Sequence, residues 1–142
     1  MMNHSSKPRI VVLGAGYAGL KTTKELMKKL LPEEAEIVLI NKHNYHYETT
    51  WLHEVAAGTI NPNQARVMLS EVVNPNRVRL IYDTVVEIKK DENLVVLENS
   101  EFTYDYLVVA LGFDTNTFGI KGMDQYAYSI KDIDSSRLIK EH

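Results

Sequence analysis

The sequence predicts an α/β fold, in which a parallel sheet with helices carries an inserted antiparallel β-meander. In the first part of the chain, unbroken apolar runs alternate with an amphipathic helical pattern. Strand, helix and strand in this order are typical of a parallel sheet that is buried on both faces. From Thr84 the pattern changes to short alternating stretches separated by turn residues, which indicates antiparallel strands. A last continuous apolar run, Tyr106–Leu111, is expected to return to the parallel sheet.

Each expected element follows from a local pattern. Arg9–Leu13 is a β-branched run that ends at Gly14, which favours a buried strand. Apolar residues at three- and four-residue steps then predict a helix that ends at Pro32. In chain order we expect strand 9–13, helix 18–30, strand 36–40, helices 49–57 and 63–73, strand 77–82, meander strands 84–90, 93–98 and 101–104, strand 106–111, and a last helix with N-caps at Asp134 and Ser135 that continues through 137–142.

The composition is that of one globular domain, residues 1–142. The chain is 44% apolar with a formal charge of −3, and its length suffices to bury a core without a disulfide or zinc staple. It has no cysteine, which excludes zinc–thiolate sites, iron–sulfur clusters and thiol redox chemistry within these residues. Its mild acidity and lack of a basic run give no indication of a nucleic-acid partner. The longest nearly apolar run, Ile10–Leu20, is shorter than the ~18 residues of a spanning helix.

A glycine-rich motif follows the first strand and opens the first helix. Gly14–Gly19 matches G-x-G-x-x-G within a strand–helix–strand unit, the context that gives this pattern its meaning. Gly14 allows a sharp turn, Gly16 lets the backbone approach a pyrophosphate, and Gly19 lets the helix pack close to the strand. The first helix would then direct its free N–H groups and the positive end of its dipole toward the anion. We therefore expect a Rossmann-like dinucleotide site here; a tight turn without a ligand is the alternative.

The second strand ends on an amide where such sites usually carry an acid. About 20 residues after the glycine motif, an acidic residue commonly holds the ribose hydroxyls. This chain has Asn41, followed by Lys42. An amide can both donate to and accept from a diol, but it adds no charge, so the choice between NAD and NADP stays open. Asn41 could also simply begin a loop, because Asn is a common turn residue.

The stretch after the second strand is rich in rings. It holds three histidines, His43, His46 and His53, together with two tyrosines and Trp51. No pair of the histidines has the i, i+4 spacing of a helical zinc site, and no carboxylate motif accompanies them, so we expect no metal. Because ligands of open α/β sheets bind at carboxyl ends of strands, rings around a flat cofactor are favoured. An ordinary loop packed on the sheet is the alternative, and the roles of the histidines stay undecided.

A second signature identifies the superfamily that the chain resembles. Tyr104–Gly112 resembles the second FAD signature of flavoproteins with two dinucleotide-binding domains, Y-D-x-L-x-x-A-x-G, with Leu111 where Thr is common. Within that superfamily, residues 41–54, Ala57–Thr59 and Thr117–Gly122 are similar to the type II NADH dehydrogenases, the single-subunit, non-proton-pumping NADH:quinone oxidoreductases. The likeness extends along essentially the whole chain, which would form about the first third of such an enzyme.

The resemblance assigns cofactor-binding roles position by position. It implies a pyrophosphate loop at Gly14, Gly16 and Ala18, and an adenosine-ribose site at Asn41 and Lys42. It also implies a residue beside the flavin at Thr50, a backbone contact to adenine at Val85, and a turn that closes over FAD at Ala110 and Gly112. The family's NADH-binding and quinone-site residues and its amphipathic membrane helices would all lie beyond His142. No residue of this chain is therefore assigned a catalytic role.

The resemblance also implies an activity. Hydride from NADH would pass to FAD, and two electrons would then pass to a membrane quinone. The disulfide reductases of this fold use a C-x4-C pair after the second strand, which is absent here, so the acceptor must be external. A small iron–sulfur protein is an alternative acceptor, as in ferredoxin-type NADH reductases, and a stand-alone dinucleotide sensor is a third interpretation.

The family resemblance further implies where the protein acts. It places the complete protein peripherally at the cytoplasmic face of the membrane and leaves a homodimer open. The sequence ends about two turns into its last helix without a stop signal, so we expect a truncated N-terminal portion. These residues alone would be soluble and inactive, with partial or lost FAD binding.

Overall fold

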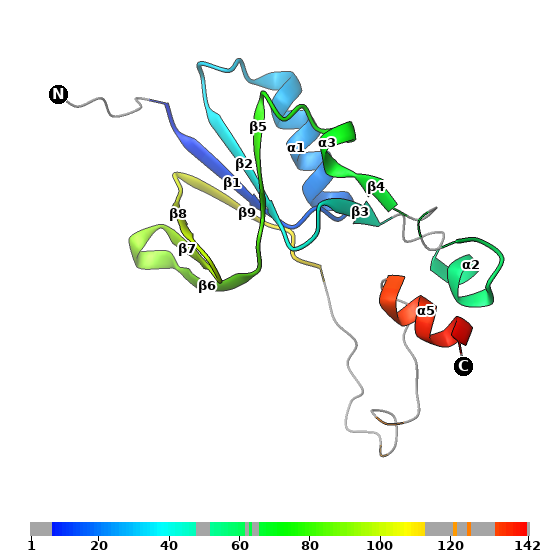
Figure 1. The fold of residues 1–142 in the computed structure, drawn as a ribbon. Helices are drawn as coiled ribbons and strands as arrows, with labels where there is room; N and C mark the ends of the chain where they lie inside the picture. The colour runs from blue at the N-terminus through cyan, green and yellow to red at the C-terminus, as the bar shows by residue number, and fades with distance from the viewer. Residues whose placement is uncertain are drawn as a thin grey trace. The chain divides into compact units, whose positions relative to one another are not determined.

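The computed structural model describes residues 7–47, 52–61, 63, 66–112, 121, 125 and 133–141. The chain divides into two compact units, which we describe separately. One comprises Met1–Tyr45 and Met68–Gly112, and the other comprises His46–Val67 and Phe113–His142. Figure 1 labels the elements of both.

The first unit is built on a four-stranded parallel sheet in the order β5-β2-β1-β9. Its strands are β1 (Arg9–Leu13), β2 (Glu36–Asn41), β5 (Val78–Tyr82) and β9 (Tyr106–Val109). Every neighbouring pair runs parallel in an unbroken register. The predicted α/β fold is confirmed, since all four predicted sheet strands are present and pair as a parallel sheet.

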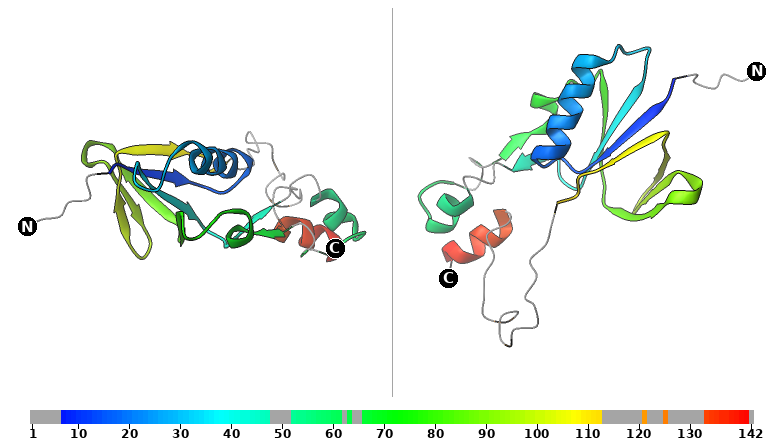
Figure 2. Two further views of the ribbon diagram at one scale, coloured as in Figure 1. Left: turned by 90° about the horizontal axis from the view of Figure 1, so that it is seen from above. Right: turned by 180° about the vertical axis from the view of Figure 1, so that it is seen from behind.

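The sheet is covered on both faces (Figure 1 and Figure 2). Helix α1 (Tyr17–Lys29) and the short helix α3 (Leu69–Val72) lie on one face, where Leu20 and Leu69 pack against Val12 of β1 and Leu39 of β2. On the other face, Val11 and its alternating neighbours pack against the inserted meander. Because successive strand residues point to opposite faces, a strand covered on both sides needs apolar residues at every position, and this explains the unbroken runs in the sequence.

The meander is confirmed as an antiparallel three-stranded sheet in the order β6-β7-β8. Its elements are β6 (Val85–Lys89), a 3-10 turn η3 (Lys90–Glu92), β7 (Leu94–Leu97) and β8 (Glu101–Thr103). Asn93 closes the first turn in the left-handed conformation, at φ 50°, which Asn tolerates better than most residues. A β-bulge in β6, between Val85 and Glu87, shifts the register of its pairing with β7.

The predicted helix over residues 63–73 is wrong in its central part. Residues Arg66–Met68 form a strand, β4, that pairs with β3 (Tyr45–Tyr47), whereas the prediction is confirmed for Leu69–Val72, which form the helix α3. The Leu69 N–H also donates to the Asn44 carbonyl over 2.9 Å. Hydrogen bonds to a segment about 20 residues away outweigh the local helical pattern, and periodicity contains no information about such pairing.

The second unit contains α2 (Leu52–Ala57) and α5 (Ile133–Glu141), which pack against each other. As predicted, α2 stops at Gly58, whose φ of +78° is the left-handed conformation of a helix end. The N-cap prediction for Asp134 and Ser135 is wrong, because α5 already begins at Ile133 and Asp134 lies in its first turn. A local pattern locates a helix better than it locates the helix end.

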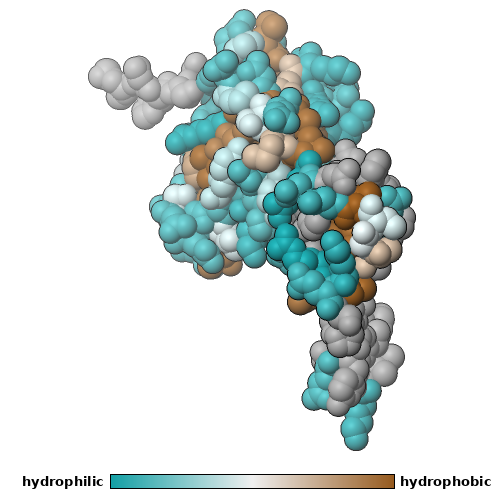
Figure 3. Space-filling model, turned by 45° about the vertical axis from the view of Figure 1, so that its right-hand side comes forward, coloured by the Kyte–Doolittle hydropathy of each residue, from teal (hydrophilic) through white to brown (hydrophobic). Residues whose placement is uncertain are grey.

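The described surface is mostly polar where Figure 3 presents it, with smaller apolar areas between hydrophilic side chains. Among the residues that the structure describes, none of the helices has the length and apolar character required to span a bilayer.

Candidate functional site

Parallel pairing brings the ends of four strands to one edge of the sheet (Figure 1). Gly14 follows β1, Lys42 follows β2, Val85 comes shortly after β5, and Ala110 follows β9. The carboxyl edge of an open parallel sheet is the usual place of ligand binding. The topology therefore gathers most of the sequence-predicted cofactor residues at a common edge.

Two glycines of the motif are required by the packing of the chain itself. Gly14 has a φ of +94°, and a Cβ at this position would overlap the Ala110 carbonyl oxygen. A Cβ on Gly19 would overlap the Gly14 carbonyl oxygen in the same way. The Ala110 N–H donates to the Leu13 carbonyl over 2.8 Å, which holds β9 against this turn. The strand, the turn and the start of α1 thus meet with no room for side chains.

Gly16 differs from these two, since no described neighbour requires a glycine there. Its φ of −74° and ψ of −168° are accessible to any residue, and among the described residues no atom beyond its two chain neighbours lies within 4 Å of the position that a Cβ would take. The open space lies directly at the start of α1. A glycine at this position leaves the backbone accessible to an outside group.

The start of α1 suits an anionic group. Gly16 occupies the N-cap position without a side-chain cap, and the first turn contains no acidic residue. The positive end of the helix dipole and the first-turn N–H groups are therefore not screened by a carboxylate of the helix. Gly16, Tyr17 and Ala18 are exposed, whereas Gly19 and Leu20 are buried. This exposed first turn fits the diphosphate of a dinucleotide, as the motif predicts.

Asn41 connects the glycine loop to the turn after β2. Its Oδ1 accepts from the Ala15 N–H over 3.0 Å, and its Nδ2 donates to the His43 carbonyl over 2.7 Å. A longer contact of 3.4 Å joins Nδ2 to the Tyr45 carbonyl. Lys42, the next residue, is exposed. Sequence reasoning found Asn41 but missed these bonds, since no periodic pattern indicates a contact to a loop 26 residues earlier.

The remaining predicted residues occupy different settings. Val85 is half-buried at the start of β6, next to the bulge, and packs against the core beneath the meander. Ala110 borders Gly14, and its Cβ lies 3.5 Å from the Cβ position of Gly19. Gly112 has a φ of +84°, and no atom of the described residues beyond its chain neighbours lies within 4 Å of the position that a Cβ would take. Thr50 lies outside the described residues.

The ring-rich stretch forms a stacked pair. His43 stacks on Tyr45, with ring centroids 4.8 Å apart and an interplanar angle of 12°. His46 is buried in β3. Trp51 lies outside the described residues. Within the described part of the chain, no three His, Cys, Asp or Glu residues gather in a group that could hold a metal ion.

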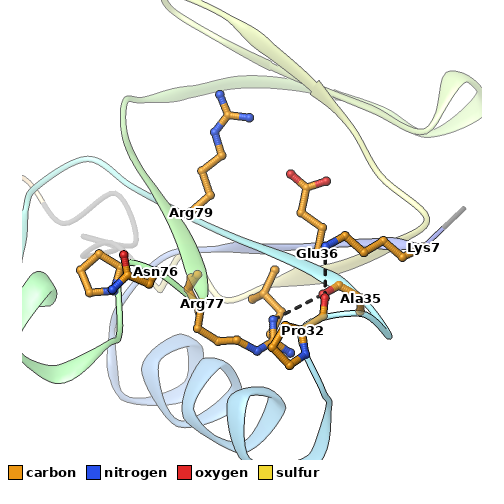
Figure 4. Close-up of a pocket in the computed structure, with 10 residues that line it drawn as sticks. Lys7, Pro32, Ala35, Glu36, Asn76, Arg77 and Arg79 are labelled. Carbon is orange, nitrogen blue, oxygen red and sulfur yellow. Dashed lines mark hydrogen bonds between the residues drawn. The ribbon is translucent and has the colours of Figure 1, made fainter. Parts of the chain in front are cut away.

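A pocket lies at the opposite edge of the sheet, where the strands begin, and basic side chains that line it make structural hydrogen bonds (Figure 4). The Arg77 guanidinium donates to the Leu30 carbonyl over 2.8 Å and to the Ala35 carbonyl over 3.4 Å, close to the C-terminal end of α1. Lys7 Nζ donates to the Pro32 carbonyl over 3.1 Å. Cations are favoured at a helix C-terminus, so two of the basic groups lining this pocket have a structural explanation.

Comparisons with known proteins identify the family of this site. The family model described as pyridine nucleotide-disulphide oxidoreductase matches residues 8–142, nearly the entire chain. The chain belongs to the pyridine nucleotide-disulphide oxidoreductase family. The family's name refers to disulphide chemistry, but the 142 residues of this member contain no cysteine.

Among the individual proteins that the chain resembles are NADH:quinone and sulfide:quinone oxidoreductases. A type II NADH:quinone oxidoreductase from Staphylococcus haemolyticus is 44% identical over 136 residues, which cover 96% of this chain and 34% of the relative. The structure of NDH2 from Plasmodium falciparum in complex with NADH superposes with a TM-score of 0.78 at 27% identity, over 94% of this chain and 28% of that one. The sulfide:quinone oxidoreductase from Aquifex aeolicus gives a TM-score of 0.81 at 26% identity, over 94% of this chain and 31% of that one.

These findings confirm both the Rossmann-like fold and the resemblance to type II NADH:quinone oxidoreductases. The chain spans about a third of the length of the curated relatives that it matches.

Proposed function

We propose that this chain is the FAD-binding part of a type II NADH:quinone oxidoreductase. The observation that carries the proposal is the exposed start of α1, where among the described residues no atom beyond the two chain neighbours of Gly16 lies within 4 Å of the position that a Cβ would take. When bound, FAD would supply the redox chemistry, accepting a hydride from NADH and passing two electrons to the quinone. The residues of this chain would bind and orient the cofactor.

We propose a role in FAD binding for each predicted residue. Gly14, Gly16 and Ala18 would surround the pyrophosphate at the N-terminus of α1, where main-chain N–H groups favour an anion. Asn41 and Lys42 would lie beside the adenosine ribose, since Asn41 ends the neighbouring strand β2 and Lys42 follows it. The other assigned residues are Val85 at the adenine, Ala110 and Gly112 in the turn over the cofactor, and Thr50 beside the flavin.

The proposal for the electron acceptor starts from the lack of cysteine in this chain. Because none of its 142 residues is cysteine, it supplies no thiol pair to take electrons from a reduced flavin. An external acceptor is therefore proposed, and the printed names of the relatives favour quinone. We propose that the complete protein meets this quinone as a peripheral protein at the cytoplasmic face of the membrane.

Two measurements on the protein expressed from its complete gene test the proposal. The first identifies the cofactor released on denaturation, for which we expect FAD at close to one per chain. Gly16→Val should abolish this flavin, because its branched side chain would fill the pyrophosphate position. Release of NAD in place of FAD, or normal flavin in Gly16→Val, would contradict the assignment.

The second measurement compares electron acceptors. NADH oxidation should proceed with a soluble quinone and fail with ferredoxin. Turnover with ferredoxin alone would favour a ferredoxin-type reductase, and tight dinucleotide binding without any turnover would favour a sensor.

A further inference from the structure

The side chain of Asn41 occupies the junction between the glycine loop and the turn that follows β2. It accepts one hydrogen bond from Ala15 and donates to His43, with the longer contact to Tyr45 on the same side. Asn41 itself is fixed by the sheet, since it pairs with Tyr82 in the register between β2 and β5. The amide therefore joins two loops to a rigid strand end.

The two contacts require opposite hydrogen-bonding abilities. The Ala15 N–H needs an acceptor, and the His43 carbonyl needs a donor. An amide provides both at once, whereas an ionised carboxylate can only accept. An aspartate would keep the bond to Ala15 but would place its second oxygen against the His43 carbonyl, 2.7 Å away in the present geometry. The amide at this position, where an acid is usual, thus has a structural reason.

The bond to Ala15 acts on the part of the loop that would contact the cofactor. Ala15 is buried between Gly14 and Gly16, and the preceding Gly14 N–H donates to the Ile40 carbonyl over 2.7 Å. Two consecutive N–H groups of the loop are therefore held by the end of β2. Both Nδ2 hydrogens face backbone carbonyls, which leaves Asn41 little capacity to bind a ribose diol in two places.

We propose that Asn41 is a positioning residue, whose amide holds the glycine loop in the conformation that receives the dinucleotide diphosphate. The proposal rests on the proposed FAD-binding function. In this role Asn41 acts through Ala15 and Gly16, and Lys42 is the exposed side chain left to face the ribose.

The test compares Asn41→Asp with the parent and with Asn74→Asp in the complete protein. Asn74 is an exposed residue before β5, and its Oδ1 accepts from the Asn76 N–H over 3.0 Å. A carboxylate can make that bond equally well, so Asn74→Asp is a matched control for the change of charge. The FAD-free proteins are titrated with FAD at pH 8 and at pH 5.5, and circular dichroism reports folding.

At pH 8, Asn41→Asp is expected to weaken FAD binding at least about 10-fold, because an ionised carboxylate cannot donate to the His43 carbonyl and leaves that acceptor beside a negative charge. At pH 5.5 the affinity should recover in part, because a protonated carboxyl can donate to the His43 carbonyl. The carbonyl raises the pKa of the introduced carboxyl, so the favourable contact is present below that pKa and is lost as the pH rises through it. The parent and Asn74→Asp provide the baseline for the other charged and titratable side chains around the site, Lys42, His43, Tyr45 and Asp83.

The outcomes separate the two proposals. Failure of the parent to bind FAD would overturn the proposed function. Binding by the parent together with equal affinity of Asn41→Asp at pH 8, or loss without any recovery at pH 5.5, would overturn the positioning role. Unfolding of Asn41→Asp at both pH values would also overturn it, because Asn41 would then support the whole fold and not the loop.

Discussion

Replacement of Gly16 by alanine separates the requirements of the fold from those of the ligand. Among the described residues, no atom beyond the two chain neighbours lies within 4 Å of the added Cβ, and the backbone at φ −74° accepts an L-residue without strain. We therefore expect the FAD-free Gly16→Ala protein to fold like the parent. Gly19→Ala serves as the contrast, because its Cβ would overlap the Gly14 carbonyl oxygen.

The expected change in stability is small because two effects oppose each other. Replacing a flexible glycine at a compatible site stabilises a protein by about 0.4–1 kcal/mol through the unfolded chain. Alanine is a poorer N-cap residue than glycine, by roughly 0.5–1 kcal/mol, and Gly16 is the N-cap of α1. The two effects leave the free energy of unfolding within about 0.5 kcal/mol of the parent.

Cofactor affinity should change much more. If the diphosphate fills the space beside Gly16, a methyl group there overpacks the complex, which typically destabilises by about 1–3 kcal/mol. This corresponds to a roughly 5- to 150-fold larger dissociation constant for FAD. Titration of the FAD-free protein by flavin fluorescence measures the affinity, and thermal unfolding of the same sample measures the stability.

Two results would refute this reasoning. Parent-like FAD affinity of Gly16→Ala would mean that the cofactor does not approach Gly16. If the free energy of unfolding of the FAD-free protein falls by more than about 2 kcal/mol, the fold itself requires this glycine, because losses of that size come from specific defects such as overpacking.

Three further predictions address the scaffold around the site, each measured by unfolding of the FAD-free complete protein. Gly19→Ala should destabilise it by about 3 kcal/mol or more through backbone overlap, and a parent-like midpoint would contradict the close approach. Arg77→Met should lower stability by about 1–3 kcal/mol, because the Leu30 carbonyl at the end of α1 and the Ala35 carbonyl before β2 lose their charged donor; no change would show that water replaces the guanidinium. Leu39→Ala, in the core under α1, should lower it by about 2–5 kcal/mol, and a loss below 1 kcal/mol would indicate a relaxed core.

Much of the sheet could be predicted because its signals are local. The run Arg9–Leu13 and the helical pattern after it each fit within one element, and both elements are present with similar bounds. The meander was also predictable, since alternation and turn residues such as Asp91 and Asn99 act over a few positions. By contrast, β3 and β4 form through pairing across distant segments, and the local pattern around Arg66–Met68 pointed to a helix.

The sequence by itself determined the kind of site: a glycine motif between a strand and a helix, followed by a second signature ending at Gly112. From the motif it predicted a sharp turn at Gly14, an approach to a pyrophosphate at Gly16 and close packing at Gly19, but it did not identify the atoms that these glycines meet. Only the tertiary structure decided that Gly14 and Gly19 are required by neighbouring backbone while Gly16 faces open space. It also decided that Asn41 bonds to Ala15. The physical reason is that close approach and hydrogen bonding depend on which atoms the folded chain brings together, and sequence spacing does not encode those distances.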